Sequence, residues 1–551
     1  MNSPQTLTVD VLIVGAGPVG LTLANLLGQY GIQTLIIERN ANTVAEPRAV
    51  TLDDESLRTM QNAGLGPQVI QDVVLGYGVQ YFSWRGKPLA SILPTRQEYG
   101  YPKRNAFRQP LLEGTLRSGL QRFAQVQTRF LHELLEWDAR SDGVHCRVRA
   151  PEGELHVQAR WMVGCDGGRS RVRERCGISL KGATYAERWL IVDMEQRNTP
   201  LRHTRTYCDP VRPAIRLPGP FGTLRYEFML RPGESDEFAL DEARFRGWMA
   251  DRVPEDRNLP LVRKVVYTFH ARVASHWRQG AVFLAGDAAH LTPPFAGQGL
   301  NSGVRDAANL AWKLAAVARW GAPEALLDTY EAERRPHATA LINMALRIGH
   351  FMQPKTALAA ALSQGALGLA CIVPAVRDYI LQLRFKPKPR FNSGFFEASD
   401  SAATVSTELL PQPLLDLPDR STCRLDDLLG HGFAVLGWDS HALRAQAARW
   451  VPAGAPCRVI ALRRSEEDFI NVRPDDQVTC ARDGSGVLDA FLDGLNAAAI
   501  VVRPDRYWCR VIPQPGSTST DSPADSWCLG DLRSAPPETA APPRQPHPTT
   551  A

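Results

Sequence analysis

The spacing of apolar residues near the N-terminus predicts a strand, a helix and a second strand in succession. The apolar run at 11–14 is too short for a helix and is rich in the β-branched residues that buried strands prefer. From 21 to 27, leucines and an alanine recur at helical spacing, and Gly31 ends this helix. A second apolar run follows at 34–37. This stretch therefore predicts one strand-helix-strand unit.

Three glycines, in the phrase GAGPVG, stand where the first strand meets the helix. Gly15 allows a tight turn, Gly17 lets the backbone approach a pyrophosphate, and Gly20 lets the helix pack close to the sheet. Glu38 ends the second strand, where a carboxylate can hold the 2′-hydroxyl of an adenosine ribose and would repel a 2′-phosphate. The unit predicts a site for the ADP part of a dinucleotide, with a chance glycine turn as the alternative.

The pattern changes twice further along the chain. Short strands are predicted at 76–104, with a hairpin at 84–88, and period-2 stretches from 182 to 268 predict a mostly antiparallel sheet. A buried strand at 281–285 then returns to the first domain, and helical periodicity follows from 304. The antiparallel sheet is therefore expected to interrupt the nucleotide-binding domain.

The C-terminal part of the chain has its own pattern. Apolar strands at 433–437, 457–462 and 499–502 alternate with helical pieces, which predicts a third, α/β domain. Beyond 513 the chain is rich in Pro, Ser, Thr and Ala, a composition typical of disorder. We expect four parts. A nucleotide-binding domain comprises residues 1–75, 105–181 and 270–385, and a substrate domain comprises residues 76–104 and 182–269. A C-terminal domain spans residues 400–512, and a disordered tail spans residues 513–551.

Composition narrows the class of protein. A chain of 551 residues exceeds what one core usually holds, in line with several domains. The net charge of +5 comes without a block of Lys or Arg, so nucleic-acid binding is not suggested, whereas an anionic small substrate is compatible. None of the ten cysteines forms a CxxC pair, which argues against a zinc site and favours reduced thiols in the cytosol. No secretory signal is visible, so we expect a cytoplasmic protein without a metal.

One uncharged stretch, at 357–376, is long enough to span a bilayer. It is rich in Ala and Gly, carries Ser363 and Gln364 and is interrupted by Pro374. These residues favour a buried helix, or a helix that contacts a second subunit, over a membrane span.

Two further glycine-rich turns follow predicted strands. GCDGGRSRVR at 164–173 places Asp166 after an apolar piece, and GDAAHLTPPFAGQGLNSG at 286–303 places Asp287 after the strand at 281–285. Either motif alone indicates only a turn after a strand. Together with GAGPVG, in this order, the three form a specific set.

On these three motifs the chain resembles the flavin-dependent aromatic hydroxylases of the p-hydroxybenzoate hydroxylase and phenol hydroxylase type. Four further phrases resemble the subfamily that hydroxylates 3-(3-hydroxyphenyl)propionate and 3-hydroxycinnamate: TLDDESLRTM at 51–60, RNAFRQP at 104–110, CDPVRP at 208–213 and RFKPKPRF at 384–391. The resemblance implies an α/β fold: a Rossmann-like FAD-binding domain interrupted by a mostly antiparallel β substrate domain, plus a C-terminal thioredoxin-like domain. FAVLGW at 433–438 and RPDRYW at 503–508 resemble that last domain, but it lacks the CxxC, so packing or dimer support is expected rather than a redox role.

The resemblance also implies which residues contact FAD. The ADP part would lie against Gly15, Ala16, Gly17, Pro18, Gly20, Glu38 and Arg39. The ribityl and pyrophosphate region would lie against Arg48, Gln109, Asp166, Gly286 and Asp287, of which Asp166 also supports nicotinamide binding. The isoalloxazine ring would pass beside Pro294, Gly297, Gly299, Leu300 and Asn301.

The residues themselves suit these roles. A helix that begins near Leu300 presents free N–H groups and the positive end of its dipole, which suits the edge of a reduced flavin where negative charge gathers; an ordinary helix start is the alternative. No second GxGxxG exists, since 484–486 lacks the third glycine, so NADH is expected to visit transiently.

The resemblance implies a reaction in aromatic-acid catabolism. NADH reduces FAD, O2 adds to give a C4a-hydroperoxide, and its distal oxygen attacks the ring carbon ortho to a phenol, giving the 2,3-dihydroxy product. A phenol of pKa ~10 is only about one part in a thousand ionised at pH 7, so activation as phenolate requires ~4 kcal/mol from the pocket. The catalytic acid or base stays unassigned. Our candidates for substrate contact, each with a structural role as the alternative, are Tyr207, Arg212, Arg216, Arg225, Tyr226 and Pro293.

Other functions stay open. His290 belongs to a proton path or is a structural histidine, and Phe295, Trp189 and Phe228 are candidate walls of a dry pocket. A hydroxylase of another phenol or of an aromatic polyketide would have the same three-domain plan. A flavin halogenase is disfavoured because no WxWxIP-like phrase occurs. A flavin-binding protein without catalysis is a different class. A homodimer is compatible, and the residues do not decide between NADH and NADPH.

Overall fold

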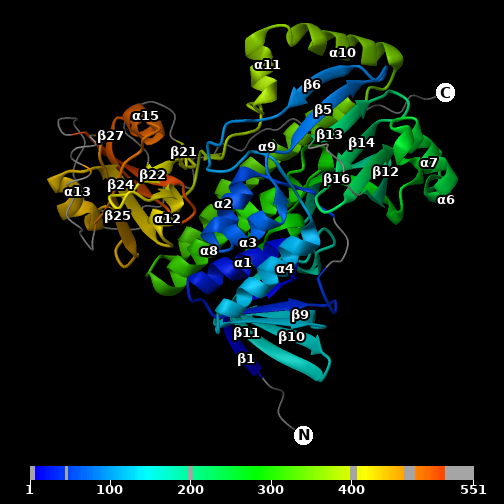
Figure 1. The fold of residues 1–551 in the computed structure, drawn as a ribbon. Helices are drawn as coiled ribbons and strands as arrows, with labels where there is room; N and C mark the ends of the chain where they lie inside the picture. Colours follow the sequence, from blue (N-terminus) through cyan, green and yellow to red (C-terminus); the bar gives the residue numbers. More distant parts are fainter. Residues whose placement is uncertain are drawn as a thin grey trace.

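The computed structural model describes residues 6–43, 48–196, 203–397, 406–464, 469 and 478–514. Figure 1 shows three parts: a domain that carries the N-terminus, a second sheet above it, and the C-terminal domain to one side. The predicted disordered tail lies almost wholly outside the described residues, and only its first two residues are described.

The first sheet is built around β1 (Thr6–Val14), whose neighbours β2 and β11 both run parallel to it. Its order is β17-β18-β11-β1-β2-β8, and β10 and β9 continue antiparallel from β11. Val14 pairs with Gly164, and Gly164 pairs with Leu284, so the three predicted turns leave adjacent strands at one edge. The remaining strands are β2 (Thr34–Glu38), β8 (Val126–Phe130), β9 (Glu133–Arg140), β10 (Gly143–Ala150), β11 (Gly153–Gly164), β17 (Arg278–Gln279) and β18 (Val282–Leu284).

Helices cover this sheet. α1 (Pro18–Gln29) packs against α8 (Gly299–Arg319) and α4 (Gln109–Gly119). α1 and α8 bury apolar residues at helical spacing, such as Leu23 and Leu27 on α1, and this burial stabilises both helices. Shorter elements of this domain are β3 (Thr51–Leu52), α2 (Asp54–Asn62), α3 (Gly66–Gln71), β4 (Val73–Val74), β7 (Asn105–Phe107) and α5 (Arg171–Arg175).

The second sheet has the order β19-β16-β12-β15-β14-β13-β5-β6, in which only β13 and β5 pair in parallel. We call it the substrate sheet. The predicted hairpin forms β5 and β6 at its edge. Register partners across four strands are Tyr81, Thr206, Ile215 and Glu227, which therefore share one face. The elements are β5 (Gly78–Ser83), β6 (Pro88–Ile92), β12 (Leu180–Glu195), β13 (His203–Cys208), β14 (Ala214–Pro218), β15 (Thr223–Met229), α6 (Asp236–Leu240), α7 (Glu242–Ala250), β16 (Leu261–Ala274) and β19 (His290–Leu291).

The C-terminal domain has a mixed five-stranded sheet of order β26-β25-β24-β27-β28 with its own apolar core. β24, β25 and β26 run parallel to one another, whereas β27 pairs antiparallel with both β24 and β28. Its thioredoxin-like assignment stays a prediction. The elements are β22 (Leu414–Asp416), β23 (Thr422–Arg424), α12 (Leu425–Leu429), β24 (Phe433–Trp438), α13 (His441–Gln446), β25 (Cys457–Leu462), β26 (Val478–Ala481), α15 (Val487–Gly494), β27 (Ala497–Val502) and β28 (Trp508–Pro513), with β20 (Arg390–Phe391) and β21 (Thr407–Glu408) at the junction.

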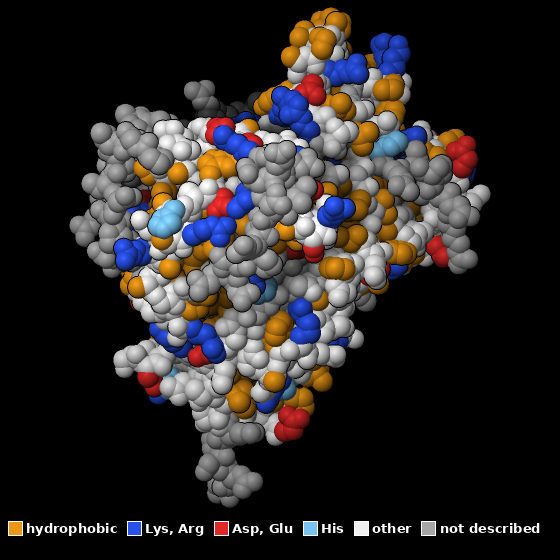
Figure 2. All heavy atoms as spheres, turned by 60° about the vertical axis from the view of Figure 1, so that its left-hand side comes forward, with side chains coloured by type: hydrophobic (Ala, Val, Ile, Leu, Met, Phe, Trp, Pro, Cys, Tyr) orange, Lys and Arg blue, Asp and Glu red, His pale blue; other side chains and the backbone are white. Residues whose placement is uncertain are grey.

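After α9 (Thr329–Met352), the chain forms a projecting arm of α10 (Ala357–Ala370) and α11 (Pro374–Leu381) (Figure 1). The prediction of a buried helix here is wrong: Leu358 and Leu369 are each 70% exposed, and apolar side chains gather on the arm in Figure 2. Within the described residues, α10 and α11 reach the length and hydropathy of a membrane span only as a pair bent by 108°, and no single helix reaches them.

Candidate active site

A cavity of about 480 Å³ opens between the first sheet and the substrate sheet. One end is lined by the three glycine-rich turns, and the other by β5, β13, β14 and β15. The turns therefore meet in space around one cavity. Of the predicted cofactor residues, the lining includes Gly15, Ala16, Gly17, Pro18, Glu38, Arg39, Arg48, Gln109, Asp166, Asp287, Pro294, Gly297, Gly299 and Leu300.

The first turn is shaped by close backbone contacts. Gly15 has φ of +110°, and a side chain there would meet the carbonyl oxygen of Cys165 at 2.5 Å. At Gly20, a Cβ would lie 2.1 Å from the Gly15 carbonyl, so only glycine lets α1 start this close to β1. A Cβ at Gly17 would meet nothing within 4 Å, because this position faces the cavity. The turn thus leaves room for a ligand at the uncapped N-terminus of α1.

Glu38 is held at the cavity wall by three hydrogen bonds. Its carboxylate accepts from the Ala16 N–H at 3.1 Å, from the Asn40 N–H at 2.9 Å and from the Asn40 side-chain amide at 2.6 Å. The carboxylate is therefore fixed beside the glycine turn, at the position expected of a ribose ligand.

The two acidic turns each present a carboxylate to the cavity. Asp166 accepts from the Val172 N–H through one oxygen, while its Oδ1 is buried without a hydrogen-bond partner among the described residues. Burial raises the pKa of Asp166, and Asp287 is exposed to the cavity. Ligand hydroxyl groups would satisfy both carboxyls, as the ribityl and ribose parts of FAD can do. The donor and acceptor set of the cavity therefore fits FAD.

The segment opposite these turns is positioned by Gln109 and Asn301. Gln109 accepts from the Ala49 N–H at 2.8 Å and donates to Glu113. Asn301 accepts from the Asp53 N–H and the Ser56 hydroxyl, and donates to the carbonyls of Thr51 and Gly297. These bonds set the cavity-lining residues 49–51 beside the N-terminus of α8, which has no side-chain cap. Its free N–H groups lie where the resemblance puts the flavin ring.

Three of the predicted cofactor residues do not line the cavity, namely Gly20, Gly286 and Asn301. Gly20 and Asn301 set the positions of α1 and α8 as described. Gly286 has φ of +62°, and a Cβ there would lie 2.9 Å from Val19. Each of the three shapes the backbone around the cavity.

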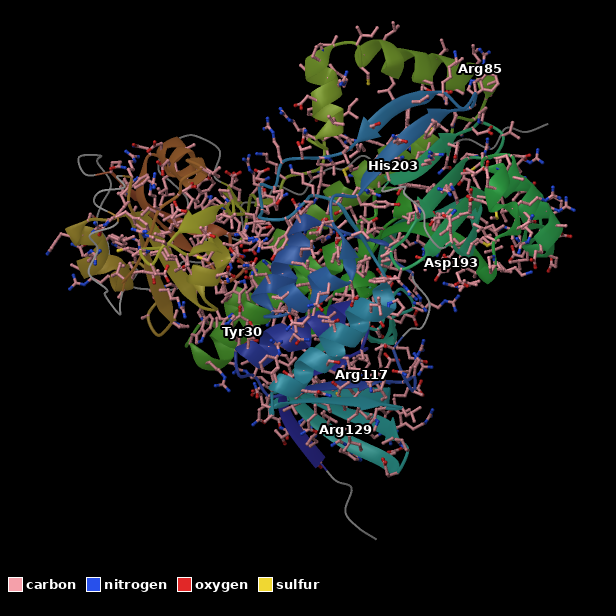
Figure 3. All side chains as sticks on the ribbon, viewed as in Figure 1. Tyr30, Arg85, Arg117, Arg129, Asp193 and His203 are labelled. Carbon is pink, nitrogen blue, oxygen red and sulfur yellow. The ribbon has the colours of Figure 1, made fainter. Side chains whose placement is uncertain are left out.

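Of the predicted substrate residues, only Arg225 lines the cavity. It pairs with Asp193 at 2.7 Å and donates to the Arg48 carbonyl at 3.0 Å. Asp193 lies on the substrate sheet, well away from Tyr30 on α1 (Figure 3). Arg225 thus ties the substrate sheet to the 48–51 segment.

The other substrate candidates lie outside the lining. Arg212 pairs with Glu234 at 2.6 Å, and Arg216 pairs with Asp256, which also accepts from the Tyr226 hydroxyl. Tyr207 stacks on Phe82. Strand alternation is the reason: Ile215, Leu217 and Glu227 face the cavity, so their neighbours Arg216 and Tyr226 face the opposite side. Pro293 is also outside the lining, although Pro294 belongs to it.

Sequence reasoning missed several residues of the substrate half of the cavity, which we define by Val79, Tyr81, Ile92, Thr204, Thr206, Ile215, Leu217 and Glu227. Lys103, Arg104 and Lys386 also line it. Arg104 and Lys386 stand in two of the phrases that carried the resemblance, which was a usable signal. Alternation from Arg225 would have given Glu227.

His290 does not line the cavity. It is fully buried, and its Nε2 lies 2.7 Å from Asp306, which in turn pairs with Arg334. This placement favours the structural role that we gave as its alternative.

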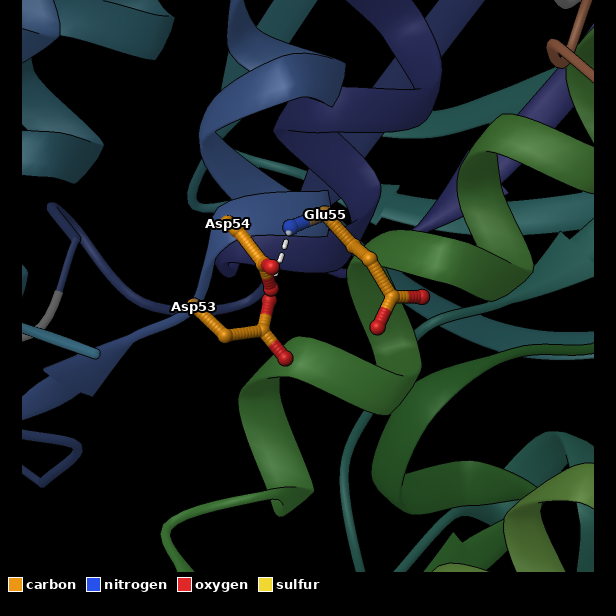
Figure 4. Close-up of side chains that lie close together, drawn as sticks. All are labelled: Asp53, Asp54 and Glu55. Atoms are coloured by element: carbon orange, nitrogen blue, oxygen red, sulfur yellow. Dashed lines mark hydrogen bonds between the residues drawn. The ribbon is translucent and has the colours of Figure 1, made fainter. Parts of the chain in front are cut away.

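Three carboxylates, Asp53, Asp54 and Glu55, lie together at the start of α2 (Figure 4). Two cations pair with two of them: Arg305 bonds Glu55 at 2.6 Å, and Lys386 lies 2.8 Å from Glu55 and 3.0 Å from Asp53. Burial opposes ionisation, yet Arg305 and Lys386 hold the pKa of Glu55 well below its usual range. Asp53 and Glu55 are thus held in ion pairs behind the cavity wall, which Lys386 reaches from the same cluster.

Comparison with known proteins shows the family to which the chain belongs. A family model described as FAD binding domain matches residues 8–345, and one described as HcaD C-terminal domain matches residues 407–522. The chain is 41% identical to a 3-(3-hydroxy-phenyl)propionate/3-hydroxycinnamic acid hydroxylase from Mycolicibacterium smegmatis, over 92% of this chain and 90% of that protein. A protein of the same name from Klebsiella pneumoniae subsp. pneumoniae is 38% identical over 92% of both chains.

Solved structures share the fold. The flavin-dependent monooxygenase PieE, in complex with FAD and substrate, gives a TM-score of 0.76 at 23% identity, covering 92% of this chain and 96% of that one. The p-nitrophenol 4-monooxygenase PnpA from Pseudomonas putida gives 0.62 at 27% identity, covering 69% and 98%. The FAD-binding family model matches more than half of this chain, and the named hydroxylases align with it over about nine tenths of both lengths. The chain therefore belongs to the family of FAD-dependent aromatic-ring monooxygenases.

Proposed function

We propose that this protein hydroxylates 3-(3-hydroxyphenyl)propionate and 3-hydroxycinnamate at the ring carbon ortho to the hydroxyl, using NADH and O2. The observation that carries the proposal is the 41% identity, over about nine tenths of both chains, to a hydroxylase named for these two acids. The cavity supports it, because its substrate half combines apolar walls with a few polar groups.

FAD, when bound, supplies the redox chemistry that activates O2 after reduction by the nicotinamide. The protein holds it through the N-terminus of α1, Glu38, Asp166, Asp287 and the N-terminus of α8. The chain's own contribution to the rest of the reaction is to bind the phenol, keep out water and take up a proton.

The substrate half of the cavity is built to exclude water. Its walls carry Phe295 and Leu383 together with Val79, Ile92, Ile215, Leu217, Met344, Ile348 and Met352. Phe295 packs edge-on against Trp189, which is fully buried and supports that wall. A dry pocket limits the loss of activated oxygen as H2O2.

Glu227 is our candidate for taking the phenol proton. It faces the cavity from the middle of the substrate sheet, and its nearest cation is Arg225, whose Nη1 lies 4.0 Å from Oε1. Burial raises the pKa of Glu227. An oxygen of this carboxylate accepts the phenolic proton, which brings the ring to the electron-rich phenolate that ortho attack requires.

The test is turnover of the purified FAD-loaded protein with NADH and a panel of phenols, scoring catechol product against H2O2. We expect product from the two acids. Peroxide alone from both acids, with product from a polycyclic or another phenol, would contradict the substrate assignment. Tight FAD binding without phenol-stimulated NADH oxidation would contradict catalysis altogether.

We also propose a homodimer in the cytoplasm. The apolar arm supports the dimer, because Leu362 and Ile372 are 66% and 73% exposed on it, and monomers rarely expose such patches without a partner. The described cysteines are all free, as in a reducing compartment. Sedimentation of the wild type and of the Leu369→Glu, Ile372→Glu double variant tests the dimer: the wild type should be dimeric and the variant monomeric. A monomeric wild type at micromolar concentration would contradict it.

A further inference from the structure

Arg104 presents an uncompensated guanidinium to the substrate half of the cavity. Its side chain lines the cavity, and its Nε is buried without a hydrogen-bond partner among the described residues. No carboxylate of the described residues lies within 4.0 Å of it. Burial lowers its pKa, which reports the cost of holding this charge away from water.

The other cations of this half are already paired. Lys103 lies 3.5 Å from Glu98, Lys386 bonds Asp53 and Glu55, and Arg225 bonds Asp193. The two tyrosines beside Arg104 cannot balance its charge, because burial raises the pKa of Tyr81 to about 12 and that of Tyr77 further. Arg104 is therefore the cation here that a ligand anion would neutralise.

The backbone at Arg104 is firmly placed. Its carbonyl accepts from the Tyr77 N–H at 2.8 Å. The next residue, Asn105, is fully buried and donates to the carbonyls of Leu52 and Pro102. Tyr77 itself donates to the Pro218 carbonyl at 2.5 Å. The backbone from which Arg104 projects is thus fixed by the substrate sheet and the 51–52 strand together, which gives the side chain a defined point of attachment at the cavity.

We infer that Arg104 binds the side-chain carboxylate of the substrate and so sets which end of the molecule points to Glu227. This inference rests on the proposed function. Tyr81, beside Arg104, and Glu227 are register partners three strands apart, about 14 Å between their Cα atoms. Arg104 and Glu227 therefore stand apart in the lining of the same cavity, so the acid end and the hydroxyl end of one aromatic molecule can each meet one of them.

The experiment compares an acid with its uncharged analogue. Arg104→Met and Arg104→Lys are assayed with 3-(3-hydroxyphenyl)propionate and its propionamide, for kcat/KM and, without NADH, for Kd from the change in flavin absorbance. We expect Arg104→Met to lose roughly 100-fold for the acid in both quantities and less than about threefold for the amide, with Arg104→Lys in between. Arg85→Met, an exposed arginine in the β5–β6 turn (Figure 3), is the matched control and should behave as wild type.

Equal losses for acid and amide, or no loss for the acid, would overturn the role of Arg104 while the proposed function stands. A wild type that hydroxylates neither compound overturns the proposed function instead. FAD content and thermal unfolding are measured for each variant. If Arg104→Met does not hold FAD, the acid-to-amide ratio of Arg104→Lys decides: an unchanged ratio overturns the inference.

Discussion

At the scale of single residues, the substrate sheet separates side chains that face the cavity from those that build the core. Glu227 faces the cavity, whereas the adjacent Tyr226 points to the other side and bonds Asp256. One step along a strand thus decides between a chemical and a structural role. Arg212 and Arg216 lie outside the cavity lining, and each forms an ion pair, with Glu234 and Asp256 respectively, that keeps it away from the cavity.

Glu227→Gln tests the proton acceptor. The pKa of Glu227 is raised, so the charged form that can accept a proton is lost as the pH falls through this raised value. We expect kcat to fall about 100-fold in Glu227→Gln, and the acidic limb of the wild-type pH profile to disappear. Flavin content serves as the control. A variant that keeps the acidic limb would show that another group takes the proton.

At the scale of elements, the turn between β1 and α1 gives two glycines opposite functions. Gly20 faces protein and Gly17 faces the cavity, although they are only three residues apart. Gly20 allows the helix to approach the strand closely, and Gly17 leaves the helix N-terminus accessible to a ligand. A matched pair of substitutions can separate the two.

Gly20→Ala should destabilise the protein by about 1–3 kcal/mol, because its Cβ would overlap the Gly15 carbonyl. Gly17→Ala should leave the unfolding temperature of the FAD-free protein unchanged, since Gly17 has φ of −76°, which alanine adopts freely, but should weaken FAD binding. Thermal unfolding and FAD titration measure both effects. Equal stability of the two variants would contradict this assignment of the turn.

At the scale of the whole molecule, buried charges join the C-terminal domain to the FAD domain. Glu333 on α9 forms ion pairs with Arg503 and Lys313, each at 2.8 Å. Arg58 on α2 pairs with Asp426 at 2.7 Å. All these side chains are buried, so each depends on its partner. The C-terminal domain therefore fixes the helices behind the cavity.

Acid should weaken this junction. Burial alone would raise the pKa of Glu333, but Arg503 and Lys313 lower it to about 2. A carboxylate with a depressed folded pKa contributes stability that is present above its unfolded pKa of ~4.3 and is lost as the pH falls towards 2. We expect Glu333→Gln to lose about 3–5 kcal/mol at pH 7 and to unfold with less dependence on pH between 5 and 2. Denaturant unfolding at several pH values measures this, with the exposed Glu154→Gln as control. Parallel pH curves for variant and wild type would contradict it.

The sequence by itself determined the three turns and the acidic end of β2, because a glycine turn at a strand end depends on backbone conformation within a few residues. The sequence motifs also identified the family, and the family implied the FAD cofactor. Tertiary structure alone decided which arginines pair with distant carboxylates, such as Arg216 with Asp256, and that the buried Nε of Arg104 has no partner among the described residues. It also decided that α10 is exposed, since an apolar sequence does not say what covers it. Partners far apart in the chain set the charge of a pocket, and no local pattern contains them.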